Sequence, residues 1–338
     1  MKQHLRVLVV FDLPAKPANA DWASQLRPED WQKDLDIIQA VKKLGHEVRL
    51  LGLYDQVRPL MVEIRRHPPD IVFNLLEAFA NERRHESHLA GLLELLGVRY
   101  TGSRPASLSL CRDKLVAKRI LAPHRIKVPR SVVFPLGKTN RSLKSLRFPV
   151  FVKPLGLEGS DGIAQRSFAE QAESCMERVR FLHANLKTDV LVEEYIEGRE
   201  LYASVIGNER LRVLPVRELI FTQFPEERPK FASYKAKWDD AFRKKWGIQN
   251  IFAEDLSQSA QRKINHTCRT AFRALGLTGY GRLDLRLTAQ GDIYVIEVNP
   301  NPALNREDEL AQSAQKAKLS YTHLIERILS LGYYRRPA

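Results

Sequence analysis

Residues 282–302, with the sequence RLDLRLTAQGDIYVIEVNPNP, constrain the fold more than any other stretch of the chain. The opening RLDLRL alternates charged residues with leucines, which is the period of a half-buried strand. AQGD at 289–292 is a hairpin-type turn signal, and IYVIEV at 293–298 follows as a second, deeply buried strand. We therefore expect two adjacent antiparallel strands joined by a tight turn.

This hairpin carries three side chains whose oxygens could bind a cation. Glu297 and Asn299 are two residues apart on the second strand, so they face one way, and Asp284 on the first strand can lie near that pair. Two carboxylates and an amide oxygen suit Mg²⁺, which is usually shared with water and nucleotide phosphates rather than caged by protein alone. The alternative is an edge hairpin whose polar face is only solvated.

Length and composition indicate a globular chain of more than one domain. With 338 residues and 44% hydrophobic content, the chain can bury substantial cores, and its length favours two or three domains. The longest apolar run near the start, Val7–Phe11, is far too short for a membrane span or a secretory segment. Three scattered cysteines without CxxC spacing fit reduced thiols and argue against a zinc site. We expect a cytoplasmic protein with no membrane partner.

The charge balance predicts anionic ligands without choosing among them. Fifty-four Lys and Arg against forty Asp and Glu give a formal charge of +14. The asymmetry is steepest between Arg112 and Lys153, where twelve basic residues accompany a single acid, Asp113. A nucleic-acid surface would interleave such charges with stacking aromatics, which are sparse here. A basic lobe beside a nucleotide is therefore favoured over nucleic acid.

The first third of the chain has the pattern of a parallel α/β unit. No GxGxxG follows the first strand, so a dinucleotide site has little support. Asp113 and Lys114 fall inside the last predicted helix of this part. The predicted elements are strand 5–13, helix 30–44, strand 46–51, strand 70–75, a helix over 89–96 and a helix over about 108–121.

The remainder alternates strands and helices around one irregular segment. Residues 224–247 lack clear periodicity, which is typical of a mobile functional loop. GKT at 137–139 is not a Walker A motif, because Val132 stands where that motif needs glycine. The other predicted elements are strand 128–135, strand 148–154, helix 168–186, a strand from 190, strands 201–206 and 211–216, helix 257–275 and a final helix over about 312–331.

Two short stretches suggest contacts to a nucleotide. Lys153 ends a buried strand and precedes the loop GLEGSDG at 156–162, so an ammonium and backbone N–H groups could hold phosphates, although a plain strand and turn is the simpler explanation. Further on, the strand end around 193–200 carries four acids in an otherwise basic chain. Such carboxylates can accept from an adenine amino group or ribose hydroxyls, and an exposed acidic turn is the alternative.

Taken in order, these features resemble the ATP-grasp superfamily and, within it, the D-alanine:D-alanine ligase group. The resemblance covers about Asp70 to Leu331. The segments that carry it are LLE at 92–94, GVRYTGS at 97–103, DK at 113–114, VKP at 152–154, EGS at 158–160, VEEYIEGRE at 192–200, KW at 237–238, GRLD at 281–284 and EVNPNP at 297–302.

The resemblance implies an α/β protein in which an N-terminal Rossmann-like (pre-ATP-grasp) domain precedes a two-lobed ATP-grasp α+β fold. The expected domains are 1–110 for the N-terminal unit, 111–196 for the central ATP-grasp lobe and 197–338 for the C-terminal lobe with the magnesium and substrate site. A homodimer is the family expectation.

The resemblance also assigns roles to individual side chains. The nucleotide-binding set is Lys114 and Lys153 at the ATP phosphates, Lys237 at the terminal phosphates from a closing loop, Glu193 at adenine with Glu194 and the backbone near Ile196, and Glu200 at the ribose. Asp284, Glu297 and Asn299 would hold Mg²⁺. Arg282 would stabilise oxyanion charge, and Ser160 would help to position substrate.

The activity implied by the resemblance is carboxylate activation with ATP and Mg²⁺, with two ions expected and Mn²⁺ as a substitute. One substrate carboxylate attacks the γ-phosphate to give an acylphosphate and ADP, and an amine then displaces phosphate to form an amide. Catalysis of this kind depends on positioning and on cations that oppose negative charge. The sequence agrees, since it shows no convincing Ser/His/Asp or Cys/His arrangement.

Departures from the group concern the substrate. The glycine-rich N-terminal segment with its ammonium-binding Glu has no equivalent here, and residues 76–88 replace the group's HisGly and GlyGluAspGly segment. A loop tyrosine becomes Trp238, and the glycine after the final turn becomes Ala303. We therefore predict a ligase for other amino acids or small peptides. The alternatives are an authentic D-alanine:D-alanine ligase, an enzyme that modifies a protein or peptide tail, and a non-catalytic ATP-binding regulatory protein.

Overall fold

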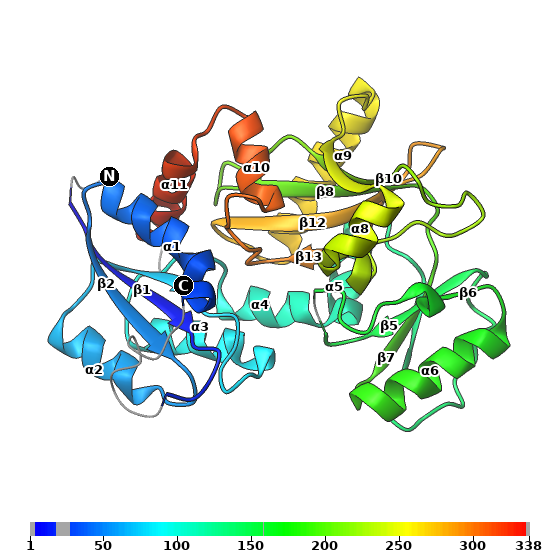
Figure 1. Cartoon of the computed structure of the whole chain (residues 1–338), viewed down its shortest axis with the longest axis horizontal. Helices are drawn as coiled ribbons and strands as arrows, with labels where there is room; N and C mark the ends of the chain where they lie inside the picture. The colour runs from blue at the N-terminus through cyan, green and yellow to red at the C-terminus, as the bar shows by residue number, and fades with distance from the viewer. Residues whose placement is uncertain (1–3, 18–27, 158, 336–338) are drawn as a thin grey trace.

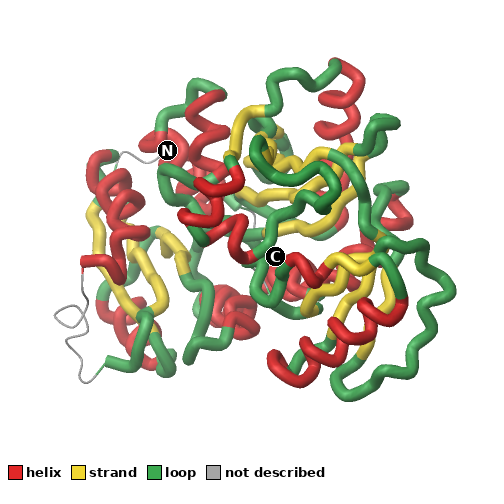
Figure 2. The backbone as a smooth tube through the Cα atoms, turned by 45° about the vertical axis from the view of Figure 1, so that its right-hand side comes forward, coloured by secondary structure: helices red, strands yellow, loops and turns green. Residues whose placement is uncertain are grey.

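Three β-sheets with helices packed against them make up the protein, as a computed structural model shows for residues 4–17, 28–157 and 159–335 (Figure 1). The sheets have three, six and four strands. Turning the molecule by 45° separates them clearly (Figure 2). None of the helices among the described residues combines the length and the hydropathy of a bilayer-spanning segment.

The first sheet is parallel and has the order β2-β1-β3. Its central strand is apolar on both faces, because helices cover both sides of the sheet. Val7 and Val9 pack toward one core, and Leu8 and Val10 toward the other. The elements are β1 (Arg6–Asp12), α1 (Pro28–Lys43), β2 (Glu47–Leu53), α2 (Arg58–Arg66), β3 (Ile71–Leu75), the 3-10 helix η2 (Arg83–His85) and α3 (Glu86–Leu95).

A helix from the far end of the sequence completes this first core. Leu324, Ile325 and Ile328 on α11 (Tyr321–Tyr333) are fully buried and pack in one cluster with residues of β1 and β3. The predicted boundaries at 110 and 196 stay predictions, and the position of α11 means that the first sheet's core includes residues from both ends of the sequence.

The second sheet is antiparallel and has the order β4-β7-β5-β6. One helix, α6, packs against it through Cys175, Val179 and Leu182, which are fully buried. This sheet lies at the lower right of Figure 1. Its elements are β4 (Ser131–Phe134), β5 (Val150–Pro154), β6 (Phe168–Ala169), α6 (Ala172–Leu186) and β7 (Val190–Glu194).

The six-stranded sheet has the order β11-β10-β8-β12-β13, with β9 paired to β8. Helix α9 covers one face through Ile264, Cys268 and Phe272. The strands are β8 (Arg199–Ile206), β9 (Arg212–Val213), β10 (Arg217–Phe221), β11 (Ile248–Phe252), β12 (Tyr280–Leu287) and β13 (Ile293–Asn299). The remaining helices are α4 (Pro105–Arg112), α5 (Lys114–Leu121), the 3-10 helices η3 (Ala122–His124) and η4 (Gln165–Ser167), α7 (Tyr234–Trp238), α8 (Asp240–Trp246), α9 (Gln258–Ala274) and α10 (Glu309–Lys316).

The predicted hairpin is confirmed as β12 and β13. Asp284 lies directly opposite Glu297, and Arg282 opposite Asn299, in an antiparallel register. The register shifts after Asp284, so that Leu285 pairs with Val295 and one residue of β13 is left over. This irregularity adds twist beside the carboxylates.

The predicted helix over 108–121 is wrong in one important respect, because it breaks at Asp113. That residue has an extended backbone (φ −82°, ψ 97°), and its carboxylate accepts hydrogen bonds from the N–H groups of Leu115 and Val116 at 2.9 and 3.0 Å. Asp113 therefore caps α5, and Lys114 becomes the first residue of a new helix.

Other elements also differ from the predictions. Residues 224–247 are not wholly irregular, since they contain α7 and α8, each begun by a capping side chain, Ser233 and Asp239. The predicted helix from 168 begins as strand β6, the strand over 211–216 shortens to two residues, and the final helix is two helices, α10 and α11. Helix α2 and strands β10 and β11 were not predicted.

Candidate active site

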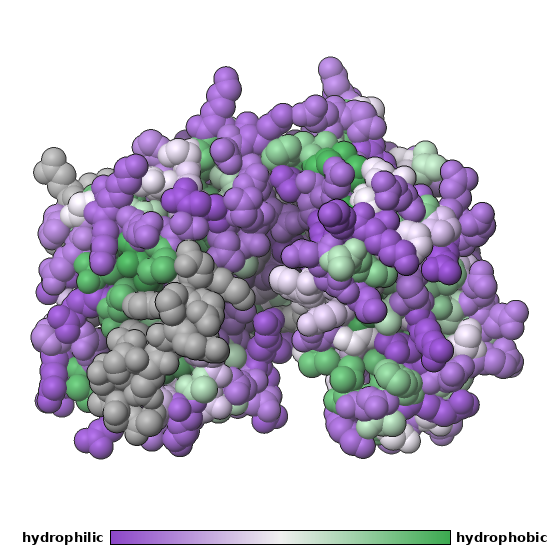
Figure 3. Space-filling model, in the orientation of Figure 1, coloured by the Kyte–Doolittle hydropathy of each residue, from purple (hydrophilic) through white to green (hydrophobic). Residues whose placement is uncertain are grey.

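A pocket lies between the four-stranded sheet and the six-stranded sheet, where strands β5 and β7 face strands β8, β12 and β13. The space-filling view is hollowed between the first sheet's helices and the four-stranded sheet (Figure 3). The pocket is lined by Phe151, Lys153, Ser160, Ile163, Glu193, Glu194, Tyr195, Ile196, Glu200, Phe231, Ala232, Lys237, Asp284, Leu285, Arg286, Ile296 and Glu297. Nine of the predicted site residues are among them, from segments far apart in the sequence.

One wall holds a buried carboxylate between two lysines. Glu193 is the last but one residue of β7 and lies across from Phe151 of β5, and its side chain meets that of Lys153 at an Nζ–Oε1 distance of 2.5 Å. Its other oxygen accepts from the Nζ of Lys118, on the buried face of α5. All three side chains are at most 6% exposed. Lys118 was not predicted, although it follows Lys114 by one helical turn.

Electrostatics within this trio favour an ionised carboxylate. Burial opposes ionisation of Glu193, but the charges of Lys118 and Lys153 outweigh it and hold the pKa of Glu193 below its ordinary value. For Lys118, burial is the largest influence and lowers the pKa to about 8, against the attraction of Glu193. Two lysines share one carboxylate, so one of them is held less firmly as a cation.

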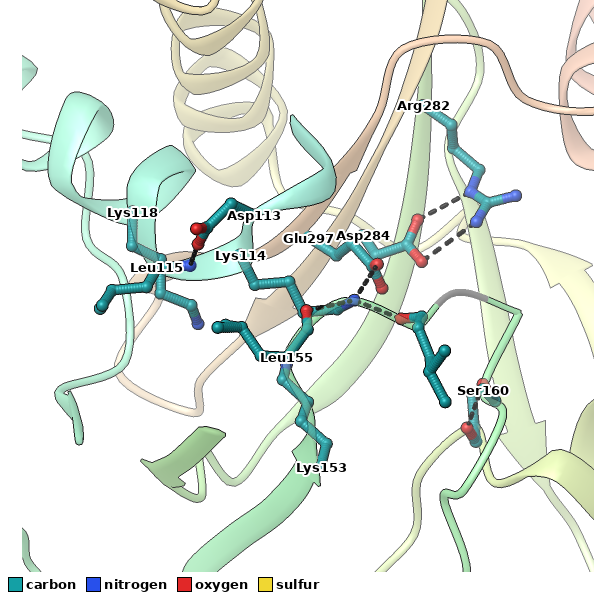
Figure 4. Close-up of polar contacts among 12 residues, drawn as sticks. Asp113, Lys114, Leu115, Lys118, Lys153, Leu155, Ser160, Arg282, Asp284 and Glu297 are labelled. Carbon is teal, nitrogen blue, oxygen red and sulfur yellow. Dashed lines mark hydrogen bonds and ion pairs between the residues drawn. The ribbon is translucent and has the colours of Figure 1, made fainter. Parts of the chain in front are cut away.

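The opposite wall is the hairpin, where two carboxylates from adjacent strands are each paired to a cation (Figure 4). Arg282 donates two parallel hydrogen bonds to the Asp284 carboxylate, Nε to Oδ1 at 2.7 Å and Nη2 to Oδ2 at 3.2 Å. The Nζ of Lys114 lies 3.2 Å from Oε1 of Glu297. These pairs place positive charge on both sides of the carboxylates that were predicted to hold a metal ion.

Lys114 reaches the hairpin because the capped start of α5 points it there. Its ammonium is buried, and it donates to the carbonyl oxygens of Leu157 at 2.5 Å and Leu155 at 3.4 Å (Figure 4). It thus ties the glycine-containing loop after β5 to Glu297. Lys114 is therefore a cation held between Glu297 and the loop that was predicted to bind phosphates.

Lysines surround Glu297 and set its charge. Burial opposes ionisation of this carboxyl, but Lys114, Lys153 and Lys237 together lower its pKa to about 2. Lys237 belongs to α7, one of the two helices inside the segment predicted as a loop. The base of the pocket therefore combines the ionised Glu297 and the neighbouring carboxylate of Asp284 with several fixed cations.

Two loops meet over the pocket. The hydroxyl of Ser160 donates to the carbonyl of Ala232 at 2.9 Å, and the indole Nε1 of Trp238 donates to the carbonyl of Gly159 at 2.8 Å. Ser160 has φ +66°, a left-handed conformation that a tight turn imposes on it. The loop after β5 and the segment before α7 are therefore in contact, as expected for parts that close over a ligand.

A second buried network, around Glu200, was not predicted. Its carboxylate receives donors from Arg286, Tyr202 and the backbone of Ala232. The sequence had marked Arg286 only as part of an alternating strand. A register pair explains the contact, because Arg286 of β12 lies opposite Glu200 of β8.

The donor set suits a divalent cation shared with a nucleotide rather than one caged by protein. Within the described ranges, no cluster of three or more His, Cys, Asp or Glu side chains could hold a metal alone. Asp284 and Glu297 instead supply two adjacent carboxylates, and the remaining ligands would come from amide, water and phosphate oxygens, which is the pattern for Mg²⁺.

Three predicted residues lie beside the pocket rather than in its lining. Lys114 lines a smaller adjoining cavity with Lys118 and Glu297. Arg282 lies behind Asp284 and within 3.9 Å of Glu309. Asn299 follows at the end of β13, where its Oδ1 accepts from the N–H of Asn301 at 3.1 Å.

Comparisons with known proteins identify the family. The sequence model described as "D-ala D-ala ligase C-terminus" matches residues 135–330. A D-alanine–D-alanine ligase of Thermotoga maritima is 30% identical over 306 residues, which cover 88% of this chain and 90% of that protein. The chain belongs to the D-alanine–D-alanine ligase family. An uncharacterized protein of Sinorhizobium fredii, y4sG, is 29% identical over 327 residues, which cover 91% of this chain and 90% of the relative.

The fold agrees with this family. A crystal structure of the D-alanine–D-alanine ligase from Bacillus anthracis complexed with ATP superimposes with a TM-score of 0.74, at 20% identity over 97% of each chain. The predicted ATP-grasp architecture and the resemblance are thereby confirmed. So is the enzyme class, since members of the D-alanine–D-alanine ligase family are ATP-dependent ligases that form an amide bond.

The segment that departs from the D-alanine–D-alanine ligase pattern lies against the final turn of the hairpin. Glu86, in the replaced segment 76–88, accepts from Nδ2 of Asn301 at 3.1 Å. Ala303 follows that turn and is exposed, and Trp238 is 62% exposed beside Gly159. Of the three departures, Trp238 adjoins Lys237 in the pocket lining, and segment 76–88 and Ala303 lie at the turn after β13.

Proposed function

We propose that this ligase uses ATP and Mg²⁺ to join amino acids or small peptides, and that its recognition of the first substrate differs from that of D-alanine. The observation that carries the proposal is the pairing of Asp284 with Glu297 across the hairpin, with Lys114 and Arg282 fixed at 3.2 and 2.7 Å from their carboxylates. A site of this kind can oppose the charge of a triphosphate and of an acylphosphate.

The proposed chemistry needs no nucleophile from the protein. A substrate carboxylate oxygen bonds to the γ-phosphorus as the bond to ADP breaks, and an amine nitrogen then bonds to the acyl carbon as phosphate leaves. Lys114 and Lys153 hold phosphate oxygens, and Lys237 approaches the terminal phosphates from α7. Arg282, paired with Asp284 beside the pocket, is proposed to oppose the charge of the developing oxyanion. When bound to Asp284, Glu297 and Asn299, Mg²⁺ would neutralise phosphate charge and act as a Lewis acid.

Nucleotide contacts come from the other wall. Glu193, Glu194 and the backbone at Ile196 line the position proposed for adenine, and Glu200 the position proposed for ribose. Because Lys118 and Lys153 hold Glu193 as an anion, this carboxylate can only accept hydrogen bonds, which suits an exocyclic amino group.

The contacts of residues 76–88 support a changed amino-acid pocket. This segment turns through two left-handed residues, Ala80 and Asn81, and its Glu86 contacts the turn that precedes Ala303. Ala303, which replaces the group's glycine, is exposed next to that turn, where its methyl group would limit the approach of a substrate. Ser160, bonded to Ala232 in the closed loops, is proposed to position substrate.

The test is phosphate release from Mg²⁺–ATP by the purified protein across paired D- and L-amino acids and dipeptides, with mass spectrometry of the products. We expect an amide product whose formation requires ATP and disappears in Glu297→Ala. A D-alanyl-D-alanine product would overturn the proposed change of substrate. ATP binding without turnover of any pair would direct the search to a protein or peptide tail, and absence of ATP binding would contradict the nucleotide site itself.

The proposed assembly and domain division have their own measurement. We propose a homodimer of a protein with domains 1–110, 111–196 and 197–338. Sedimentation equilibrium at micromolar concentration would give twice the chain mass of 38.8 kDa for the dimer, and a single-chain mass would contradict it.

A further inference from the structure

Arg286 is a buried arginine in the wall of the pocket, and neither the motifs nor the proposed chemistry accounts for it. It is 6% exposed, and its guanidinium joins two other segments, residues 198–200 and the loop at Lys230, to its own strand β12. Nη2 donates to Oε2 of Glu200 at 2.8 Å and to the carbonyl of Lys230 at 2.9 Å, and Nη1 donates to the carbonyl of Gly198 at 2.8 Å. A planar fork with this many fixed donors holds its partners in one geometry.

The Glu200 carboxylate is nearly saturated by protein donors. Oε2 accepts from Arg286 and from the N–H of Ala232 at 3.1 Å, and Oε1 accepts from the hydroxyl of Tyr202 at 3.1 Å. No other donor from residues 4–17, 28–157 or 159–335 reaches it. A carboxylate offers about four acceptor positions. One position, on Oε1, is therefore left for a ligand.

Tyr202 is a dependable donor to that carboxylate. It is fully buried, so its hydroxyl is shielded from competing water. The phenol has one proton to donate, and it gives this hydrogen bond to Oε1. Oε1 has two acceptor positions. The Tyr202 hydroxyl occupies one of them, and the other is left for a ligand.

Arg286 also fixes the segment that closes over the pocket. Tyr195 donates to the carbonyl of Lys230 at 3.2 Å, and the Arg286 guanidinium lies 5.4 Å from the Tyr195 ring. Ala232, bonded to Glu200, follows two residues later. Arg286 thus fixes the position of the Glu200 carboxylate and that of the loop around Lys230.

We propose that Arg286 is a positioning residue for the nucleotide, which orients Glu200 so that the site reads one ribose hydroxyl rather than two. The inference rests on the proposed function, in which Glu200 faces the ribose. Beyond that function, the enzyme is predicted to distinguish 2′-deoxy from 3′-deoxy nucleotides, and this discrimination is assigned to a residue outside the motifs.

The test is calorimetric binding of ATP, 2′-deoxy-ATP and 3′-deoxy-ATP to the full-length protein in Mg²⁺. One deoxy nucleotide is expected to bind about tenfold more weakly than ATP, the effect of one charge-assisted hydrogen bond, while the other stays within about threefold. Equal weakening of both analogues, or of neither, would overturn the inference. If ATP itself does not bind, the proposed function fails instead.

Variants separate a positioning role from a structural one. In Arg286→Met the Kd for ATP is expected to rise about tenfold and the difference between the two deoxy nucleotides to fall below about threefold. Arg286→Lys keeps the charge without the fork and should recover part of the affinity but little of the discrimination. Unchanged discrimination in Arg286→Met, in protein whose melting temperature shows that it is folded, would overturn the assignment.

Arg199→Met is the matched control. Arg199 lies next to Glu200 on β8 and also makes ion pairs, with Glu218 at 2.5 Å and Asp255 at 2.7 Å, but it does not line the pocket. Loss of its ion pairs should lower stability while the ratio of deoxy nucleotide affinities stays as in the unaltered protein. A loss of discrimination in this control as large as that in Arg286→Met would overturn the specific role of Arg286.

Discussion

The side-chain oxygen of Asn301 lies close against Gly102. A Cβ atom added at position 102 would be 2.6 Å from that oxygen. Gly102 has φ +89°, and the N–H of the next residue, Ser103, donates to that same oxygen at 2.9 Å. The loop after the first sheet and the turn after β13 are therefore packed backbone to side chain. Asn299, a proposed metal ligand, is two residues from the contact.

Gly102→Ala is expected to destabilise the protein by more than the cost of placing alanine in a left-handed conformation. A left-handed alanine costs about 1–2 kcal/mol, and the contact with Asn301 adds to it. Urea unfolding measures the loss. Gly97→Ala is the matched control, because Gly97 has φ +66° with nothing within 4 Å of the added Cβ. Equal losses in both variants would mean that the close approach is unimportant.

Asn301→Asp is expected to lower stability, and adding Glu86→Gln is expected to restore part of it. Asn301 donates from Nδ2 to Glu86, so the aspartate would face that carboxylate without a proton to share. The glutamine amide can donate to the aspartate instead. We expect a loss of about 1–3 kcal/mol in the single variant. Additive effects of the two changes in a double-mutant cycle would contradict direct contact.

Stability should rise with pH between about 8 and 10.5 because of Lys118. Its pKa is lowered to about 8 in the folded protein, from an ordinary 10.5. In that window the unfolded chain binds a proton that the folded chain does not, so raising the pH favours folding. The free energy of unfolding, measured with urea at several pH values, should rise less steeply with pH in Lys118→Met than in the unaltered protein.

The control for this titration is Lys127→Met. Lys127 is exposed and paired with Asp292 at 2.7 Å, which raises its pKa. Its removal should therefore not reduce the rise in stability above pH 8. If Lys118→Met and Lys127→Met have the same profile as the unaltered protein, Lys118 does not titrate in this range.

Trp238→Phe should loosen the contact between the two loops over the pocket. The phenylalanine keeps an aromatic ring but loses the N–H that bonds the carbonyl of Gly159. Hydrogen exchange of the peptides around Gly159 should be faster in the variant without ATP. Trp246→Phe is the control, because Trp246 packs against Phe224 and Phe242 away from this contact. Faster exchange in both variants would indicate a general loosening.

The sequence predicts those parts of the site that depend on local periodicity. The alternation in β12 and the spacing of Glu297 and Asn299 are sufficient to predict the hairpin and the closeness of Asp284 to that pair, but not the register shift after Asp284. The Asp113 break was missed, because apolar spacing continues across a residue whose side chain bonds its own backbone and so competes with the helix.

Long-range pairing accounts for the residues that sequence analysis missed. Lys118 and Arg286 acquire their roles from Glu193 and Glu200, partners that belong to other strands. Neither pair is visible until the strand order of the sheets is known. Helices α7 and α8 are short, and pattern reading detects short helices poorly because tertiary contacts decide them.

Helix α11 gives the protein a particular order of events during synthesis. The strands of the first sheet leave the ribosome early, yet one apolar face of that sheet is covered by Leu324, Ile325 and Ile328, which are translated long afterwards. Helix α1 supplies part of the covering of Val7 and Val9 early, through Ile37, Ile38 and Val41, but the part that α11 supplies is missing until the end of translation. The nascent chain must therefore avoid aggregation through this apolar face. A truncation or substitution in α11 would destabilise the first sheet, which is the part of the protein made first.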